Sequence, residues 1–231
     1  MEELNSFPTW VLKEYFHVEA SDYLVMLALI MVLSLAVLYS LTRNLSVERP
    51  SWVQHCLEYI VHGFDNLLTE VIGKHGRDYL PVVGTFGVLI FLCNLSGFIP
   101  GFMPPTSHLI VTLSLGLCSF VMYNLIGVAK GGFSYFKHFL GPMAALAVLF
   151  LPIELVSHCS RPVSLGIRLF CNIFGDHQVG NIFLQLVPFG VPVPFILLGL
   201  FVAFMQTFVF VILSSVYISM ALPHDESEHP E

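Results

Sequence analysis

The chain has 231 residues, of which 56% are hydrophobic and only 11% are charged, and its mean hydropathy of +0.81 is far above that of a water-soluble domain of this length. This composition excludes a soluble globular domain and predicts a polytopic membrane protein. The formal net charge of −7 argues against a nucleic-acid partner, which requires a basic surface. Five cysteines are scattered without CxxC spacing, so we expect free and buried thiols.

Residues 1–22 form an acidic segment interrupted by Pro8, without the basic start of a secretory signal or the arginine-rich composition of a transit peptide. We expect an external N-terminal segment that is not cleaved. Residues 23–41 follow as 19 residues without a charge. At about 1.5 Å per residue they match the thickness of the hydrocarbon core, so they are expected to form the first transmembrane span.

Residues 49–73 have a mixed composition with helical periodicity. Apolar residues recur every three or four positions and polar residues fill the positions between them, which predicts an amphipathic helix. The apolar set is Val53, Leu57, Ile60, Val61, Phe64, Leu67, Leu68, Val71 and Ile72. Such a helix can lie along the membrane surface or against a partner protein, and we expect the membrane surface.

Four further apolar segments follow. Residues 79–99 and 109–128 are the expected second and third spans, joined by a turn that contains PGFMPPTS. Residues 142–186 and 195–222 both exceed the ~20 residues that a perpendicular crossing needs, so each must tilt strongly or break. Residues 223–231 form an acidic tail. Without an internal repeat or a soluble domain, residues 1–231 are expected to form one all-α integral membrane unit with about five transmembrane helices and one surface helix.

The positions of lysine and arginine predict the orientation. Lys13 alone precedes the first span, and the turns at 100–107 and 187–194 carry no basic residue. The basic residues that follow the first and third spans are Arg43, Arg49, Lys74, Arg77, Lys130 and Lys137. The positive-inside rule then places the N-terminus outside and the C-terminus in the cytoplasm, with five crossings.

The most informative residue is Arg168, which lies in the apolar run PVSLGIRLFCNI. Its guanidinium stays protonated in any protein environment, and at mid-membrane depth it costs about 2.5 to 3.5 kcal/mol. No carboxylate lies three or four residues away, so its partner is expected on another helix or another chain. A narrow helical stripe lies within about 40° of Arg168. Its members are Glu154, Ser157, Arg161, Ser164, Asn172 and Gly175.

This stripe also has structural explanations. Its small residues can mark a helix contact, and the last helix has a similar stripe with Gly199, Ala203 and Gln206, where Gln206 can donate and accept hydrogen bonds. Glu154 can form an ion pair with Arg161, and Arg161 itself can extend to the membrane interface. These alternatives stay open from the sequence.

Asp176 and His177 add titratable groups to the same segment. They lie about 80° and about 180° from Arg168 around the helix, and His177 can be either a hydrogen-bonded core histidine or a proton carrier. A rival interpretation is a membrane-embedded metalloenzyme whose metal is held by Glu154, His158 and His177. HExxH is absent, however, and Arg168 would repel a cation. We therefore expect no metal and no other cofactor.

Three segments resemble subunit a of the F-type ATP synthase membrane sector: SRPVSLGIRLFCN, NLSGFIPGFMPPTS and QTFVFVILSSVYISMAL. The resemblance covers essentially the whole chain in order. It implies a non-catalytic stator subunit whose two long tilted helices curve around a ring of c subunits, and a proton channel made of two half-channels. The implied partners are the c-ring, the b subunits of the peripheral stalk, the rest of the ATP synthase and membrane lipid. Since the sequence shows no targeting peptide, we expect a bacterial inner membrane.

The same resemblance implies roles for single residues. Arg168 takes the place of the family's essential arginine, and Asn172 and Gln206 take those of its polar neighbours. Glu154 and Tyr217 stand in the places of residues associated with the ion route. A fixed positive charge would attract the arriving ring carboxylate, favour release of its ion and block direct proton transfer between the half-channels.

One position departs from the family pattern. Gly199 stands where some members carry a titratable residue, and His177 stands where members have glutamate or histidine. We expect Asp176, His177 and water to form the proton relay on this side. No GxxxxGK[ST] motif is present, so ATP chemistry must lie in partner chains.

Overall fold

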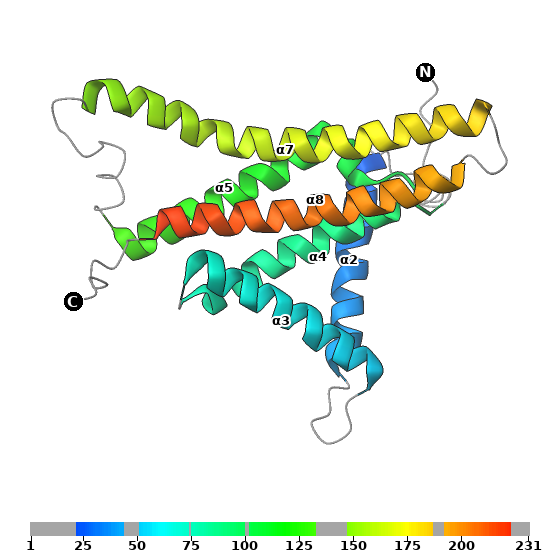
Figure 1. The fold of residues 1–231 in the computed structure, drawn as a ribbon, viewed down its shortest axis with the longest axis horizontal. Helices are drawn as coiled ribbons and strands as arrows, with labels where there is room; N and C mark the ends of the chain where they lie inside the picture. The colour runs from blue at the N-terminus through cyan, green and yellow to red at the C-terminus, as the bar shows by residue number, and fades with distance from the viewer. Residues whose placement is uncertain are drawn as a thin grey trace.

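The structure, a computed structural model, describes residues 22–43, 51–73, 75–99, 102–132, 147–186 and 192–222. Every regular element in these ranges is helical (Figure 1), which confirms the predicted all-α class. In chain order the elements are α2 (Asp22–Arg43), α3 (Trp52–Ile72), η1 (Gly76–Tyr79), α4 (Leu80–Ser96), η2 (Pro105–Ser107), α5 (Leu109–Gly131), α7 (Ala147–Leu186) and α8 (Pro192–Ala221). Residues 1–21 of the predicted N-terminal segment and the predicted acidic tail at 223–231 lie outside the described residues.

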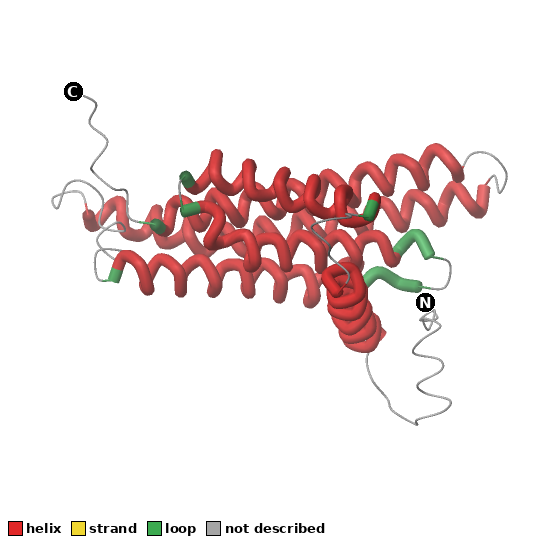
Figure 2. Tube along the Cα trace, turned by 90° about the horizontal axis from the view of Figure 1, so that it is seen from below, coloured by secondary structure: helices red, strands yellow, loops and turns green. Residues whose placement is uncertain are grey.

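The helices α4, α5, α7 and α8 run side by side, and α2 crosses their direction (Figure 1). Figure 2, turned by 90°, shows α2 nearly end-on against the long helices, so the two views agree. α5 packs against α7 and α8, while α4 and α3 both pack against α8. Because α2 runs across the others, these helices cannot all follow the membrane normal.

Four described helices are long and apolar enough to cross a membrane, by length and composition. Their windows are Tyr23–Ser40, Gly76–Ser96, Leu109–Gly131 and Val193–Ala221. α7, the remaining one of the five expected spans, is not among them, and charged and polar side chains interrupt its apolar sequence. Its 40 residues extend about 60 Å at the helical rise per residue, roughly twice the hydrocarbon thickness, so it cannot cross along the membrane normal.

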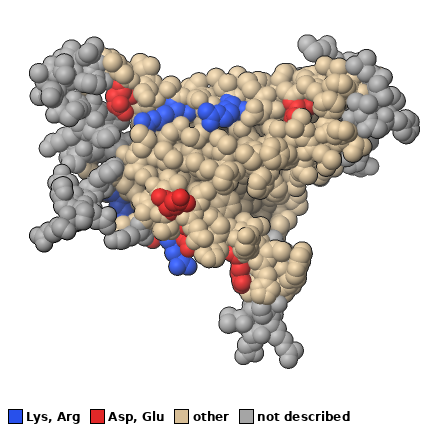
Figure 3. Space-filling model, in the orientation of Figure 1, with Lys and Arg blue, Asp and Glu red and all other residues tan. Residues whose placement is uncertain are grey.

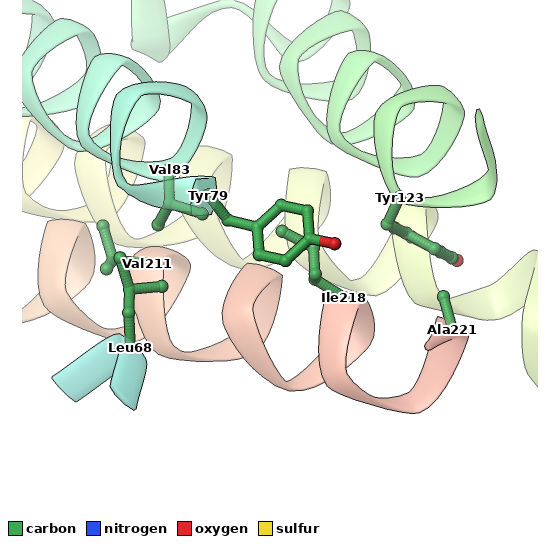
Figure 4. Close-up of a cluster of buried hydrophobic side chains, with 7 residues drawn as sticks. All are labelled: Leu68, Tyr79, Val83, Tyr123, Val211, Ile218 and Ala221. Carbon is green, nitrogen blue, oxygen red and sulfur yellow. The ribbon is translucent and has the colours of Figure 1, made fainter. Parts of the chain in front are cut away.

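Two buried apolar clusters hold the bundle together. One joins α3, η1, α4, α5 and α8 (Figure 4) through Leu68, Tyr79, Val83, Tyr123, Val211, Ile218 and Ala221. The other joins α4, α5, α7 and α8 through Ile90, Val111, Leu115, Leu165, Leu169, Ile173 and Phe210. Many other large apolar side chains face out of the chain, as expected for helices whose solvent is lipid.

Most cysteines also face out of the chain. All five are free, as expected, but only Cys93 is buried. The expectation of burial is wrong for Cys56, Cys118, Cys159 and Cys171. In a bilayer a small apolar side chain gains little from burial inside the protein, because lipid is equally apolar.

The amphipathic helix α3 begins and ends close to the predicted bounds of 49–73. Leu68 is completely buried in the first cluster, whereas Ile60 and Val61 of the predicted apolar set are 53% and 49% exposed. Gly73 ends the helix with φ of 95°, a left-handed conformation that favours glycine. The chain therefore uses only part of the apolar face of α3, and the position of α3 on the membrane surface stays a prediction.

Two glycines allow α5 and α7 to cross with their backbones in contact. A Cβ atom on Gly116 would lie 2.5 Å from the carbonyl oxygen of Pro162, and one on Gly166 would lie 2.9 Å from the Cα of Leu113. Small residues permit such close packing between helices in lipid. This crossing fixes the depth and rotation of the middle of α7 against the bundle.

Candidate functional site

The charged residues of α7 form a row on the face shown in Figure 3. Red and blue side chains follow the edge where α7 lies, in a surface that is otherwise mostly tan. The charged residues of α7 are Glu154, Arg161, Arg168 and Asp176. The row of charged side chains along α7 agrees with the charged part of the predicted stripe.

Arg168 is exposed on this chain, as are Ser157, Ser164 and Asn172, and a Cβ atom on Gly175 would meet nothing within 4 Å. No carboxylate of the described ranges pairs with Arg168. The small residues of this stripe therefore do not make a helix contact inside the chain. The glycine that does make one is Gly166, on the other side of α7.

The buried face of α7 explains why the stripe faces outward. Leu165, Leu169 and Ile173 recur at four-residue spacing and are between 0% and 4% exposed in the second cluster. Burial of these three side chains against α4, α5 and α8 sets the rotation of α7. Arg168 then lies at the border of the buried face and points away from the bundle.

Asn172 and Gln206 join the stripe to α8. The Nδ2 atom of Asn172 donates a hydrogen bond to Oε1 of Gln206 at 2.6 Å. Gln206 is 3% exposed, and its own Nε2 has no hydrogen-bond partner among the described residues. The structure thus brings together two of the predicted site residues, one helical turn beyond Arg168.

Glu154, Arg161 and Tyr217 meet at one end of the stripe. A guanidinium nitrogen of Arg161 lies 3.8 Å from a carboxylate oxygen of Glu154. The same guanidinium lies over the ring of Tyr217, 5.4 Å from its centroid, which allows a cation–π contact. The ion pair considered from the sequence is therefore present, and its arginine also contacts Tyr217 of α8.

Asp176 and His177 lie on the other side of Arg168, where they point to different helices. A Cβ atom on Gly199 would come 2.8 Å from Oδ2 of Asp176, so this carboxylate faces α8. A Cβ atom on Gly97 would come 2.5 Å from Nε2 of His177, so this ring faces the end of α4. The absence of side chains at the two glycines makes room for the two titratable groups.

Two polar residues of the bundle were not predicted as site residues. Asn94 is 1% exposed, its Oδ1 accepts a hydrogen bond from Thr106 at 2.9 Å, and its Nδ2 has no partner in the described part of the chain. Asn124 contacts His158 across 34 residues of sequence. A polar amide in an apolar span was the available signal in both cases.

The metal site considered for Glu154, His158 and His177 has no support. Nowhere in the described ranges do three His, Cys, Asp or Glu side chains gather in a way that could hold a metal ion. His158 uses its Nε2 for the contact with Asn124, and the ring of His177 faces α4.

Comparison with known proteins adds the family. The sequence pattern of the family described as "ATP synthase A chain" matches residues 24–219, a range that contains every residue of the site described above. The chain belongs to this family. Members of the ATP synthase A chain family with curated names include subunit a of Sulfurihydrogenibium sp., which is 41% identical over 202 residues, or 87% of this chain and 98% of the relative.

Two further relatives extend this agreement. Subunit a 1 of Syntrophotalea carbinolica is 44% identical over 194 residues, which cover 84% of this chain and 82% of the relative. Subunit a of Bdellovibrio bacteriovorus is 45% identical over 177 residues, which cover 73% and 77%. Together with the four apolar helices, membership of the ATP synthase A chain family identifies an integral membrane protein.

Proposed function

We propose that this chain is the proton-channel subunit of an ATP synthase, which conducts protons to and from a carboxylate on the c-ring and so couples ion flow to rotation. The observation that supports the proposal most directly is the position of Arg168. It is a permanent charge, exposed on an outward-facing stripe, without a carboxylate partner in the described part of its own chain. A buried or lipid-facing guanidinium requires a partner, and a carboxylate on a neighbouring subunit supplies one.

The chemistry follows from that charge. As a ring carboxylate approaches Arg168, the guanidinium favours its ionised form, so the ion leaves. Arginine does not exchange protons at accessible pH, and it therefore separates the two aqueous half-channels. Lysine could deprotonate when desolvated, so it is a poor substitute.

The polar clusters on α7 suggest where the half-channels run. Glu154 lies about 20 Å before Arg168 along the helix and Asp176 about 12 Å after it, from the rise per residue. We assign Glu154 and Tyr217 to one half-channel, and Asp176 with His177 to the other. Asn172 and Gln206 stand between them, where neutral amides can hold water without holding a proton.

The proposed assembly has this chain beside the c-ring and the b subunits of the peripheral stalk, within the rest of the ATP synthase and the surrounding lipid. The chain is non-catalytic, since it lacks a phosphate-binding loop and ATP chemistry belongs to partner chains. We place it in a bacterial inner membrane, and the distribution of lysine and arginine puts the N-terminus outside and the C-terminus in the cytoplasm.

The deciding experiment is ATP-driven acidification of inverted membrane vesicles that carry Arg168→Ala. Assembly of the complex is checked by the amount of this chain and by the ATPase activity bound to the membrane. Loss of acidification in assembled complexes is the expected result. Retained acidification would mean that Arg168 has only a structural role and that the proposed function is wrong for this site.

Two further variants distinguish loss of the positive charge from a general disturbance of α7. Val163→Ala shortens an apolar side chain that is 47% exposed on the same helix, and it is expected to pump as the wild type does. Arg168→Lys keeps a cation and is expected to pump far less than the wild type, because a desolvated ammonium can lose its proton.

A further inference from the structure

We propose that the hydrogen bond between His158 on α7 and Asn124 on α5 is a positioning contact, which holds the Glu154–Arg161 pair at a fixed orientation relative to Arg168. The proposal rests on the proposed function, because that function gives the pair its place in the ion route. It assigns a task to two residues that the proposed half-channels do not use.

The geometry of the contact fixes its direction. Nε2 of His158 lies 2.9 Å from Oδ1 of Asn124, and Nδ2 of the same amide donates to the carbonyl oxygen of Phe120 at 2.7 Å. Since the amide nitrogen is used on its own helix, Oδ1 faces the imidazole and can only accept. Nε2 of His158 therefore carries the proton and donates it to Asn124.

The contact is enclosed by other side chains. His158 is 7% exposed, and its ring packs 4.9 Å from that of Phe120 and 5.7 Å from that of Tyr123, between centroids. On average, an interhelical hydrogen bond in apolar surroundings favours the bonded arrangement by about threefold, and the strongest favour it by more than about tenfold. The hydrogen bond is thus strong enough to favour one rotation of the α7 segment around His158 relative to α5.

The same turn of α7 carries the ion-route pair. Glu154 precedes His158 by four residues and Arg161 follows it by three, so all three lie on neighbouring positions of the helix surface. Arg161 contacts Glu154 at 3.8 Å and the ring of Tyr217 at 5.4 Å, and the Tyr217 ring lies 5.6 Å from that of Tyr123. These contacts link α5, α7 and α8 around the Glu154–Arg161 pair.

A proline makes the positioning contact necessary. Pro162 lies inside α7 and has no N–H, so it cannot donate the helical hydrogen bond directed at the carbonyl of His158. Glu154 lies before this weakened turn and Arg168 lies after it. The turn itself is held by the approach of Gly116 to the Pro162 carbonyl. The segment before it needs its own contact with α5, which His158 and Asn124 provide.

The experiment compares His158→Leu with His158→Gln in the full ATP synthase, using ATP-driven acidification of inverted vesicles. Rates are expressed per assembled complex, so that a purely structural defect, which lowers the amount of complex, does not lower the measured rate. His158→Leu removes the donor and is expected to pump about threefold to tenfold slower, as the loss of such a bond implies. His158→Gln keeps an N–H donor at the same distance along the side chain and is expected to restore most of the rate.

Asn124→Ala removes the same bond from α5 and is expected to reproduce the His158→Leu rate, with no further loss when the two are combined. The matched control is Ser119→Ala, which removes a buried 3.1 Å contact between Ser119 on α5 and Ser214 on α8 without touching α7. It is expected to pump at nearly the wild-type rate.

Two results would overturn the positioning role. One is a wild-type rate per complex in both His158→Leu and Asn124→Ala. The other is an equal loss in His158→Gln and His158→Leu, which would assign the effect to the imidazole and not to its hydrogen bond. Arg168→Ala in the same vesicles keeps the two proposals apart: pumping by that variant overturns the proposed function, whereas the His158 results leave it untouched.

Discussion

The carboxylate of Asp176 occupies the space into which a side chain at Gly199 would extend, since a Cβ atom on Gly199 would lie 2.8 Å from Oδ2 of Asp176. The resemblance described under Sequence analysis implies that some family members carry a titratable residue at the position of Gly199. Here a titratable group reaches the same part of the α7–α8 contact from the opposite helix. In this chain, Asp176 of α7 therefore places a carboxylate in the space beside Gly199 of α8.

Exchanging the two residues tests this relationship. Asp176→Gly alone removes the carboxylate, and we expect pumping to fall about a hundredfold, the low end of what a positioned acid or base contributes. Asp176→Gly combined with Gly199→Asp returns a carboxylate to the same space from α8, so part of the rate is expected to return. Initial rates of ATP-driven acidification per assembled complex provide the measurement.

The control for the exchange is Gly199→Asp alone, which forces two carboxylates into one space. We expect it to pump less than the exchanged double variant, because like charges at short distance repel. Wild-type pumping by Asp176→Gly would contradict the assignment of this carboxylate to the ion route.

The hydrogen bond from Asn172 to Gln206 leads to a second prediction about charge. Gln206→Leu removes the acceptor, and we expect pumping to fall by about fivefold, as the loss of one interhelical hydrogen bond implies. Gln206→Glu places a carboxylate beside Asn172, which lies one helical turn after Arg168, and under the proposed function it would compete with the ring carboxylate for the guanidinium. Its loss of pumping is expected to be the larger of the two.

Thr207→Val is the matched control, because the Thr207 hydroxyl is buried and, among the described residues, bonds only to the Ala203 carbonyl of its own helix. It is expected to pump normally. If Gln206→Glu pumped better than Gln206→Leu, a carboxylate at this position would not compete for Arg168, and the role of Gln206 as a neutral spacer would be contradicted.

The sequence predicted the elements far better than their mutual contacts. Hydropathy located the apolar helices, and helical periodicity placed Arg168 and Asn172 on one stripe, as found. The sequence left open whether the small residues of the stripe mark a helix contact: Gly175 lies in open space, whereas Gly116 and Gly166 make the close crossing. Periodicity tells which residues share a face, but in lipid the outward and inward faces are both apolar, so composition does not tell them apart.

The polar contacts between helices could not be predicted from the sequence either. His158 and Asn124 are separated by 34 residues, and nothing in either local sequence selects the other as its partner. The position of Asp176 against Gly199 likewise depends on how α7 and α8 are rotated, which is fixed by burial of Leu165, Leu169 and Ile173. Such contacts follow from the packed bundle and not from any one of its helices.

The crossing of α5 and α7 carries a stability prediction. In Gly166→Ala the new Cβ atom would lie 2.9 Å from the Cα of Leu113, and this backbone cannot move without separating the helices. We expect a loss of about 1–3 kcal/mol, as for other overpacked contacts. The temperature at which detergent-solubilised complex releases this chain measures it.

Gly84→Ala is the matched control for the crossing, since a Cβ atom on Gly84 in α4 would meet nothing within 4 Å. It is expected to release the chain at the wild-type temperature or slightly above. An unchanged release temperature for Gly166→Ala would show that the two helices are not in backbone contact in the assembled complex.

The outward stripe of α7 gives the last prediction, which distinguishes a protein partner from lipid. Gly175 lies in open space on this chain, so Gly175→Phe is expected to leave the amount of folded chain unchanged. If the c-ring packs against the stripe, the added ring blocks that contact and pumping is lost. Val163→Phe enlarges a side chain that is 47% exposed and lies about 140° from Arg168 around the helix, where we expect lipid. It should pump normally, and normal pumping by Gly175→Phe as well would mean that the stripe faces lipid, leaving Arg168 without the partner that its charge requires.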